Sequence, residues 1–306
     1  MSYSTLVIGY GSIGRRHAKI LQNIKKVSNI YILTNQNDIP YKTIDSLEKI
    51  IDLNPDYIVI ASSTSKHFSH LKFLVENLSN KKILVEKPLF NSNYDLDVKN
   101  NKVFVGYNLR FHPILQKIKS AVFGKKIWNV QIFCGSYLPD WRSKKNYRLT
   151  SSAKKKLGGG VLLDLSHELD YTRWFFQDSS IHTKYVVNEK ISNLEIDSDD
   201  ILLFSGLIGD KTHIHISLNY FTRKPARQIL LDGENISIQA NLIENTLSII
   251  KNTKTSNFSY PNMSRNDSYK DQHNAILSDD LSNLCTYTDG RGTLEFINTI
   301  KNFKNN

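Results

Sequence analysis

The feature that most constrains this chain is a glycine-rich hexapeptide, Gly9-Tyr10-Gly11-Ser12-Ile13-Gly14. It follows an apolar run at 4–9 and opens an amphipathic stretch at 13–26. Between a strand and a helix, G-x-G-x-x-G spacing permits a tight turn, close backbone approach to a pyrophosphate and close packing of helix on strand. The N–H groups at the start of the helix also attract an anion. We therefore expect a dinucleotide site containing Gly9, Gly11, Ser12, Ile13 and Gly14.

Short apolar runs alternate with amphipathic stretches over the first 110 residues, which is typical of βαβ units around a parallel sheet. The predicted strands are 4–9, 29–33, 56–61, 82–85 and 102–106. Helices are predicted at 13–26, 65–78 and 112–122. This pattern predicts an α/β Rossmann domain over residues 1–123.

Beyond Gly124 the pattern changes to successive extended segments with turns between them. The predicted strands are 126–138, 181–190, 199–208, 211–221, 226–232, 235–240 and 245–251, and the stretch 251–257 is predicted to be a loop. One helix should begin after Gly158-Gly159-Gly160 and run to about Phe176, and two more should span about 266–284 and 291–303. The second domain, 124–306, is therefore predicted to be α+β with a large, open, mostly antiparallel sheet.

The choice of dinucleotide depends on the end of the second strand, where an acidic residue usually holds the ribose of NAD. Here the sequence is Leu33-Thr34-Asn35-Gln36, and the acid is missing. Thr34 or Asn35 can donate to a 2′-hydroxyl or a 2′-phosphate, and Arg15 or Arg16 can supply positive charge. The cofactor is predicted to be NAD or NADP, and these residues favour NADP. The segment after the third strand should also line the cofactor, through Ser62, Ser63, Thr64 and His67, although His67 can equally begin a helix.

Two further phrases carry groups suited to chemistry. The fourth strand ends in Glu86-Lys87-Pro88, and a lysine at the carboxyl end of a parallel strand points toward the ligand crevice. Oxidation of an alcohol needs a base, and histidine can take up a proton near neutrality, which suits His167. An ammonium stabilises the developing alkoxide, which suits Lys87. Asp164 or Asp170 could orient the imidazole.

The phrases GYGSIGRRH (9–17), VEKPL (85–89), GYNLRFHP (106–113), GSYLPDWR (135–142) and DLSHELDY (164–171) occur in this order. Together they resemble the Gfo/Idh/MocA oxidoreductases, the glucose-fructose oxidoreductase and inositol dehydrogenase family, over essentially the whole chain. They are also similar to a branch associated with bacterial surface sugars. The resemblance implies hydride transfer between nicotinamide and a sugar carbon, and a sheet domain that builds the sugar site and often a dimer face.

The resemblance also implies roles for single residues. Lys87 contacts cofactor and substrate, His167 is the acid/base, and Asp164 assists it. The family more often spaces that aspartate and histidine four apart, whereas here they are three apart, which puts the role of Asp164 in doubt. In this family the proline of the E-K-P phrase often follows a cis peptide bond, and the resemblance implies the same for Pro88. Glu86 and Asn108 belong to the expected cofactor site and Arg110 to the substrate site, although Arg110 could instead pair with a carboxylate.

A polar and aromatic loop follows the predicted strand at 126–138. Aromatic rings stack on sugar faces, and arginine grips carboxylates or phosphates with two hydrogen bonds. We therefore expect this loop to contact the substrate and Arg142 or Arg148 to recognise an anionic group, with a solvated basic loop as the alternative. The expected contact residues are Trp141, Arg142, Tyr147 and Arg148.

Composition limits the other function classes. The net charge is +11, but only 10 of the 40 basic residues are arginine and the lysines are scattered, so no nucleic-acid partner is expected. No run of about 18 apolar residues and no leader pattern occur, so no membrane contact and a cytoplasmic location are expected. Cys134 and Cys285 have no metal-ligand spacing, and His213 with His215 has no evident third ligand, so no metal is expected.

We therefore predict a cytoplasmic NAD(P)-dependent dehydrogenase or reductase of a sugar, sugar acid or nucleotide-sugar. It should form a homodimer or homotetramer through its carboxyl-terminal sheet. Two alternatives remain: a redox-neutral sugar enzyme that retains its nicotinamide, and a non-catalytic sensor that binds a dinucleotide.

Overall fold

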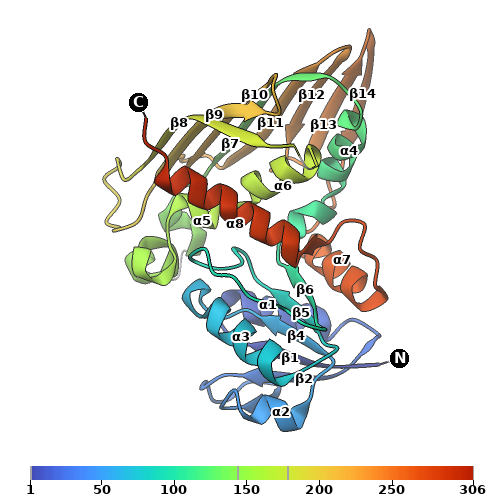
Figure 1. Cartoon of the computed structure of the whole chain (residues 1–306), viewed down its shortest axis with the longest axis vertical. Helices are drawn as coiled ribbons and strands as arrows, with labels where there is room; N and C mark the ends of the chain where they lie inside the picture. Colours follow the sequence, from blue (N-terminus) through green and yellow to red (C-terminus); the bar gives the residue numbers. More distant parts are fainter. Residues whose placement is uncertain (1, 143–144, 178, 306) are drawn as a thin grey trace. The chain divides into compact units, whose positions relative to one another are not determined.

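The computed structural model describes residues 2–142, 145–177 and 179–305, and the chain divides into two compact units (Figure 1). Unit 1 comprises Met1–Phe111 and Ser264–Leu294, and unit 2 comprises His112–Met263 and Glu295–Asn306. This division differs from the single boundary expected after residue 123, because the chain returns to unit 1 through residues 264–294. Amphipathic helices do not reveal in sequence which sheet they cover, so this return has no local signal.

Unit 1 contains a seven-stranded sheet in the order β15-β6-β5-β4-β1-β2-β3. Strands β1 to β6 run parallel, and β15 pairs with β6 in the antiparallel sense. Both central strands β4 and β5 are buried at every position, as expected where helices cover both faces of a parallel sheet. The predicted Rossmann sheet is confirmed. Its strands are β1 (Tyr3–Ile8), β2 (Val27–Leu33), β3 (Lys42–Ile44), β4 (Tyr57–Ile60), β5 (Lys82–Val85), β6 (Lys102–Val105) and β15 (Cys285–Thr286).

Helices cover both faces of this sheet. Helices α1 (Ser12–Leu21) and α7 (Arg265–Ser278) pack on one face, and α2 (Lys49–Leu53) and α3 (His67–Asn77) pack on the other. Helix α7 begins with a capping box, in which Ser264 and Asp267 satisfy each other's backbone N–H groups. Strand β1 lies between β2 and β4, so the strand order reverses there. Open α/β sheets bind their ligands at such a reversal, beyond the carboxyl ends of the strands.

Unit 2 contains an eight-stranded sheet in the order β14-β13-β12-β11-β7-β10-β9-β8. Only β7 and β10 pair in parallel, so the predicted mostly antiparallel sheet is confirmed. The prediction of a loop at 251–257 is wrong, because β14 pairs with β13 through this polar stretch. The strands are β7 (Ile127–Gly135), β8 (Ile181–Glu189), β9 (Ile201–Ile208), β10 (Thr212–Asn219), β11 (Ala226–Gly233), β12 (Ile236–Asn241), β13 (Thr246–Lys251) and β14 (Lys254–Ser259).

The helices of unit 2 are α4 (Pro113–Val122), α5 (Val161–Asp164), α6 (His167–Phe175) and the last residues of α8 (Tyr287–Asn302), which cover one sheet face (Figure 1). The single helix expected from Gly160 to Phe176 is wrong. At Leu165 the backbone has φ −100° and ψ 30°, which ends α5, and α6 starts two residues later. Asp164 therefore ends one helix and His167 begins the next.

Every described helix is too short or too polar to cross a membrane. Within residues 2–142, 145–177 and 179–305, no group of three or more His, Cys, Asp or Glu side chains gathers in a way that could hold a metal ion.

Candidate functional site

The glycine-rich turn joins β1 to α1 at the point where the strand order of unit 1 reverses. Gly9 has φ +96°, and a Cβ there would lie 3.0 Å from the Ala61 carbonyl oxygen, at the end of β4. A Cβ on Gly14 would lie only 2.0 Å from the Gly9 carbonyl oxygen. At Gly11 nothing lies within 4 Å of the same position. The turn is therefore tight on the protein side and open on the side where a phosphate would approach.

The end of β2 is engaged by the first turn of α1. Arg15 Nε donates to the Tyr10 carbonyl oxygen at 3.2 Å, and Arg15 Nη2 donates to Gln36 Oε1 at 2.9 Å. Thr34 Oγ1 accepts from the Gln36 backbone N–H at 3.2 Å, and Asn35 is exposed. Arg15 thus holds Gln36, a residue that the sequence analysis did not include in the site.

The segment after β4 holds the predicted serines and threonine. Ser62, Ser63 and Thr64 lead through a short 3₁₀ turn (Thr64–Lys66) into α3. His67 differs from its expected cofactor role. It is 1% exposed, and its Nδ1 lies 3.0 Å from the Pro88 carbonyl oxygen while its Nε2 lies 3.2 Å from that of Ser62. His67 begins α3, which was the alternative stated for it, and its buried ring lies between the carbonyl oxygens of Ser62 and Pro88, only one of which can accept from a neutral imidazole.

The Glu86-Lys87-Pro88 turn follows β5 and contains a cis Lys87–Pro88 peptide bond. Glu86 is buried, and its Oε2 accepts from the Lys87 backbone N–H at 3.2 Å. Burial alone would raise the pKa of Glu86, but the hydrogen bond from His17 and the charge of the Lys87 ammonium hold that pKa below its usual range. Lys87 therefore stands beside a buried carboxylate.

Two predicted residues after β6 are used inside unit 1. Asn108 Nδ2 donates to Ser268 Oγ at 2.8 Å, and both residues are buried. Arg110 is 3% exposed, and its Nη1 donates to the Leu284 carbonyl oxygen and to Asp289 Oδ2 at 3.2 and 3.1 Å. Arg110 thus forms the ion pair with a carboxylate that was the alternative to a substrate contact.

In unit 2 the residues of the histidine phrase lie around the break between α5 and α6. Asp164 and His167 are both half-buried, whereas Asp170 is 1% exposed. Asp164 Oδ2 accepts from the Tyr220 hydroxyl at 2.7 Å. Burial and the Asp164 charge raise the pKa of Tyr220 well above its ordinary value, so the phenol remains a donor.

The start of α5 is fixed by an acidic side chain from the segment before β9. Gly160 has φ +118°, and a Cβ there would lie 2.1 Å from Asp199 Oδ1. Asp199 Oδ2 accepts from the Leu162 backbone N–H at 3.0 Å. Burial raises the pKa of Asp199. The third glycine of the 158–160 run is thus required by this close approach, which positions α5 and with it Asp164.

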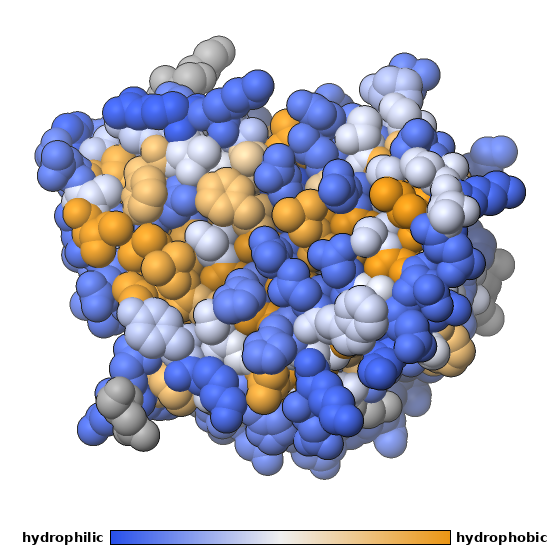
Figure 2. Space-filling view, turned by 90° about the horizontal axis from the view of Figure 1, so that it is seen from above, coloured by the Kyte–Doolittle hydropathy of each residue, from blue (hydrophilic) through white to orange (hydrophobic). Residues whose placement is uncertain are grey.

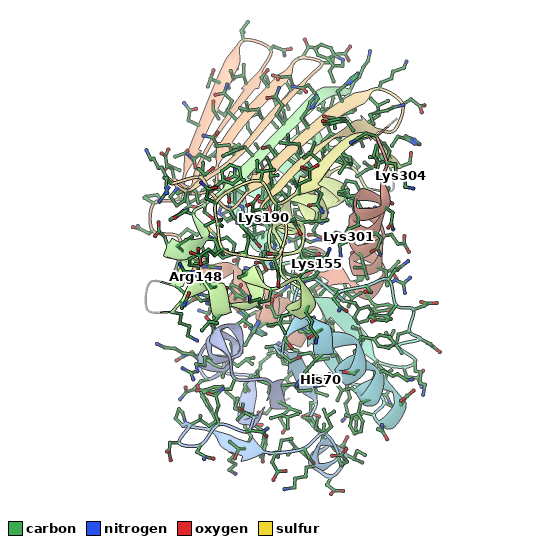
Figure 3. All side chains as sticks on the ribbon, turned by 90° about the vertical axis from the view of Figure 1, so that its left-hand side faces the viewer. His70, Arg148, Lys155, Lys190, Lys301 and Lys304 are labelled. Atoms are coloured by element: carbon green, nitrogen blue, oxygen red, sulfur yellow. The ribbon has the colours of Figure 1, made fainter. Side chains whose placement is uncertain are left out.

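Some of the side chains predicted to contact the sugar form hydrogen bonds within unit 2 instead. Trp141 is 37% exposed, donates from Nε1 to Ser136 Oγ at 2.8 Å, and contacts the Tyr220 ring edge-on at 5.3 Å. Arg142 is exposed. Arg148 Nε donates to Glu195 Oε2 at 2.7 Å, and the Tyr147 hydroxyl accepts from the Glu195 backbone N–H at 3.2 Å. Figure 3 shows Arg148 in this part of unit 2. Glu195 therefore neutralises Arg148 and leaves Arg142 as the available arginine.

Comparison with known proteins agrees with this architecture. Residues 3–98 match the family model GFO_IDH_MocA, described as an oxidoreductase family with an NAD-binding Rossmann fold. Over these residues the chain carries the NAD-binding Rossmann domain of the Gfo/Idh/MocA oxidoreductase family. It is 28% identical over 194 residues to the uncharacterized oxidoreductase YrbE of Bacillus subtilis, a match covering 56% of this chain and 52% of YrbE. The match thus spans about half the length of that relative.

Solved structures share the fold of the chain. UDP-N-acetylglucosamine 3-dehydrogenase GnnA from Acidithiobacillus ferrooxidans aligns with a TM-score of 0.76 at 18% identity, covering 98% of this chain and 97% of that one. The WlbA dehydrogenase from Bordetella pertussis, solved with NADH and UDP-GlcNAcA, aligns with a TM-score of 0.79 at 15% identity, covering 98% and 96%. At these identities the similarity establishes the fold.

In each unit, residues that were not predicted contact or lie next to the predicted ones. His70 Nδ1 lies 3.1 Å from Ser62 Oγ, and Figure 3 shows His70 on α3. Burial, followed by the charges of His67 and Lys66, lowers the pKa of His70 to about 4. Tyr220 reaches Asp164 from the end of β10, and Arg227 makes two hydrogen bonds to the buried Glu168. Their only sequence signal is a polar residue in or beside an apolar strand or helix, which does not specify its partner.

Proposed function

We propose that the protein is an NAD-dependent oxidoreductase that transfers a hydride between the nicotinamide and a hydroxyl or keto carbon of a sugar, sugar acid or nucleotide-sugar. The observation that carries this proposal is the glycine turn at the strand-order reversal. Gly14 has no room for a side chain, whereas the space at Gly11 is open. That combination suits a dinucleotide pyrophosphate at the start of α1.

NAD is preferred to NADP on two grounds. The donors Nε and Nη2 of Arg15 are bonded to Tyr10 and Gln36, so this guanidinium is already used within the protein. The family description names NAD, and the structural neighbour WlbA was solved with NADH. The preference for NADP drawn from Thr34, Asn35 and the missing acid finds no support. Fluorescence titration should show tighter binding of NADH than of NADPH, and the opposite order would reject this choice.

The chemistry is assigned to Lys87 and His167. Bound NAD would accept the hydride at nicotinamide C4. Lys87, beside the ionised Glu86, donates a hydrogen bond to the substrate oxygen and stabilises its negative charge as the hydride leaves. His167 is half-buried at the start of α6 and takes the hydroxyl proton on its imidazole, with Asp164 assisting. In the reductive direction the same imidazole returns the proton.

We propose that the substrate is a sugar that bears an anionic group. Arg142 is exposed in the loop that carries Trp141, whereas Arg148 is paired with Glu195. GnnA is named as a dehydrogenase of UDP-N-acetylglucosamine, and WlbA was solved with UDP-GlcNAcA. Arg142→Ala should raise the KM for nucleotide-sugars or sugar acids about tenfold or more, with little effect on neutral sugars. Arg148→Ala is the matched control, and equal effects of both variants would remove Arg142 as the anion contact.

The open face of the eight-stranded sheet is proposed to pair two copies of the chain. Hydrophobic residues gather among polar ones in Figure 2, and Tyr185, Leu203 and Leu230 are 48%, 37% and 40% exposed. Two rows of paired residues cross this face and contain no Lys, Arg, Asp or Glu. One row is Leu203, Ser217, Phe133, Gln228, Asn241 and Thr246, and the other is Ser205, His215, Gln131, Leu230, Gln239, Ser248 and Asn257. Rows without charge suit a self-complementary contact, because identical charged surfaces would repel each other.

Light scattering tests this pairing directly. The wild-type chain should have at least twice the chain mass, and Leu230→Lys should reduce it to one chain. Ile243→Lys, at an exposed position in the β12–β13 turn, should leave the mass unchanged. A monomeric wild type would reject the pairing without affecting the proposed chemistry.

A further inference from the structure

Four titratable side chains form a hydrogen-bonded chain behind the Glu86-Lys87-Pro88 turn in unit 1. Glu86 Oε1 lies 2.8 Å from His17 Nε2, and His17 Nδ1 lies 2.8 Å from His273 Nε2. His273 Nδ1 lies 2.7 Å from the Tyr57 hydroxyl. Tyr57, His17 and His273 are 0% exposed and Glu86 is 6% exposed. This hydrogen-bonded chain of side chains joins the end of β5 to α1, α7 and β4.

The chemistry of these groups orders the protons along the chain. A carboxylate only accepts, so His17 Nε2 carries the proton in the bond to Glu86. With neutral imidazoles, His17 Nδ1 must then accept from His273 Nε2–H, and His273 Nδ1 must accept from the Tyr57 hydroxyl. All three bonds point toward Glu86. One proton arrangement therefore satisfies every member of the chain.

We propose that this buried chain is a positioning device that holds the Glu86 carboxylate in one place and thereby fixes the backbone of Lys87. The proposal rests on the proposed role of Lys87 in hydride transfer. Glu86 Oε1 accepts from His17 while Oε2 accepts from the Lys87 backbone N–H, so one carboxylate links the chain to the turn. A Cβ on Gly106 would lie 3.1 Å from Glu86 Oε1, so the carboxylate is also confined from the β6 side. Tyr57, His17 and His273 touch neither of the reacting partners in this scheme and act through Glu86.

The pKa of Glu86 agrees with a donor at His17 Nε2. Although burial opposes ionisation, this pKa is lowered, first by the hydrogen bond from His17. Burial and the neighbouring His17 hold the pKa of His273 well below its usual value, so this imidazole is neutral. The other titratable or charged groups facing Glu86 or its neighbours are Lys87 in the same turn, His67 in α3, and Tyr269 with Arg16 and Arg265 beside it.

Two isosteric substitutions of His17 separate its two hydrogen bonds. In His17→Asn the amide oxygen replaces Nδ1 and can still accept from His273, but no donor reaches Glu86. In His17→Gln the amide N–H replaces Nε2 and still donates to Glu86, but the bond to His273 is lost. Without its donor, a buried carboxylate becomes protonated. Only His17→Asn should therefore alter the ionisation of Glu86.

Infrared spectroscopy of the full-length protein at neutral pH measures this ionisation without any turnover. His17→Asn should show a protonated-carboxyl band that is absent from wild type and from His17→Gln. Adding Glu86→Gln to His17→Asn should abolish the band and thereby assign it. No band in His17→Asn, or an equal band in His17→Gln, would overturn the proposal.

Steady-state kinetics tests the link to Lys87. His17→Asn should lower kcat about tenfold or more, as expected for loss of a hydrogen bond to a charged group, while the Kd for NADH changes less than about twofold. His17→Gln should retain a kcat close to wild type. If both variants lose kcat equally, positioning through Glu86 is rejected. If wild type turns over no substrate, the proposed function fails, while the infrared result still decides the state of the chain.

A milder variant covers the case in which His17→Asn does not fold. Tyr57→Phe removes one oxygen at the far end of the chain and leaves the ring in place. Nitrogen NMR should show one tautomer of His17 and of His273, with the proton on Nε2, in wild type and in Tyr57→Phe, because the ionised Glu86 sets the proton order from the other end. A mixture of tautomers, or a proton on Nδ1 of either histidine in Tyr57→Phe, would overturn the proposal.

Discussion

The Tyr220 hydroxyl donates a 2.7 Å hydrogen bond to Asp164 Oδ2, which connects the residue after β10 to the last residue of α5. The connection matters because α5 and α6 are separate helices, so the α-helical spacing does not fix Asp164 relative to His167. The position of Asp164 depends instead on a tertiary contact, together with the close approach of Asp199 to Gly160.

Tyr220→Phe should therefore affect both stability and activity. Loss of the hydrogen bond to a carboxylate should lower the free energy of unfolding by about 1–2 kcal/mol and kcat about tenfold. Tyr171→Phe is the matched control, because the buried Tyr171 hydroxyl has no hydrogen-bond partner among the described residues. Denaturant unfolding and steady-state rates measure the two effects. If Tyr220→Phe behaves like Tyr171→Phe, the Tyr220 hydroxyl does not position Asp164.

Alanine at two glycines should separate folding from cofactor binding. Gly14→Ala places a methyl group 2.0 Å from the Gly9 carbonyl oxygen, so the backbone must move and the melting temperature should fall by several degrees. Gly11→Ala has space and φ −74°, so the protein should melt close to wild type but bind NADH about tenfold more weakly. Thermal melts and NADH titration measure both. An unchanged NADH affinity in Gly11→Ala would show that the pyrophosphate does not bind at Gly11.

Breaking the buried ion pair of unit 2 should be costly. Glu168 is 0% exposed, and Arg227 Nε donates to its Oε1 at 2.6 Å. Glu168→Gln leaves a largely buried guanidinium without its charge partner and should lower the free energy of unfolding by about 3–5 kcal/mol. Replacing both residues, as in Glu168→Leu with Arg227→Met, should restore much of that loss. Denaturant midpoints measure these stabilities. A double variant no more stable than Glu168→Gln would contradict this explanation.

His70 should make stability depend on pH. Its folded pKa is lowered to about 4, mainly by burial, whereas the usual value of a histidine is 6.5. The unfolded chain therefore takes up the proton first, and the stabilising contribution is complete above pH 6.5 and lost as the pH falls toward 4. His70→Asn keeps an acceptor near Ser62 and has no such titration. Melting temperatures of wild type should thus fall more steeply than those of His70→Asn in this window, and parallel curves would refute the assignment.

Local patterns in the sequence predicted most of the fold. The apolar runs at β1, β2, β4, β5 and β6 lie within two residues of the predicted strands, because central parallel strands must be apolar. Strand β14 was missed because its residues, KTSNFS, are mostly polar and lie at the edge of the sheet. The short elements β3 and α2 also lack a long periodic signal. Which sheet α7 covers depends on tertiary packing alone.

The candidate site was predictable where chemistry requires a residue type at a fixed position in the chain. The glycines and Lys87 belong to this group. Partners distant in sequence were not predictable: Asp289 for Arg110, Glu195 for Arg148 and the carbonyl oxygens around His67. A buried or paired polar side chain looks the same in sequence as one that faces a ligand. For Arg110, Arg148 and His67, the structure therefore shows partners within the protein where the sequence suggested contact with a ligand.

Hydride transfer itself provides the most direct test. Wild type, Lys87→Met and His167→Asn should be incubated with NAD and a panel of sugars, sugar acids and nucleotide-sugars, and nicotinamide reduction followed by absorbance. We expect wild type to reduce NAD with a substrate from this panel. Both variants should still bind NADH but lose kcat by about a hundredfold or more. Variants as active as wild type, or a wild type that binds NADH yet reduces no NAD with any member of the panel, would contradict the account.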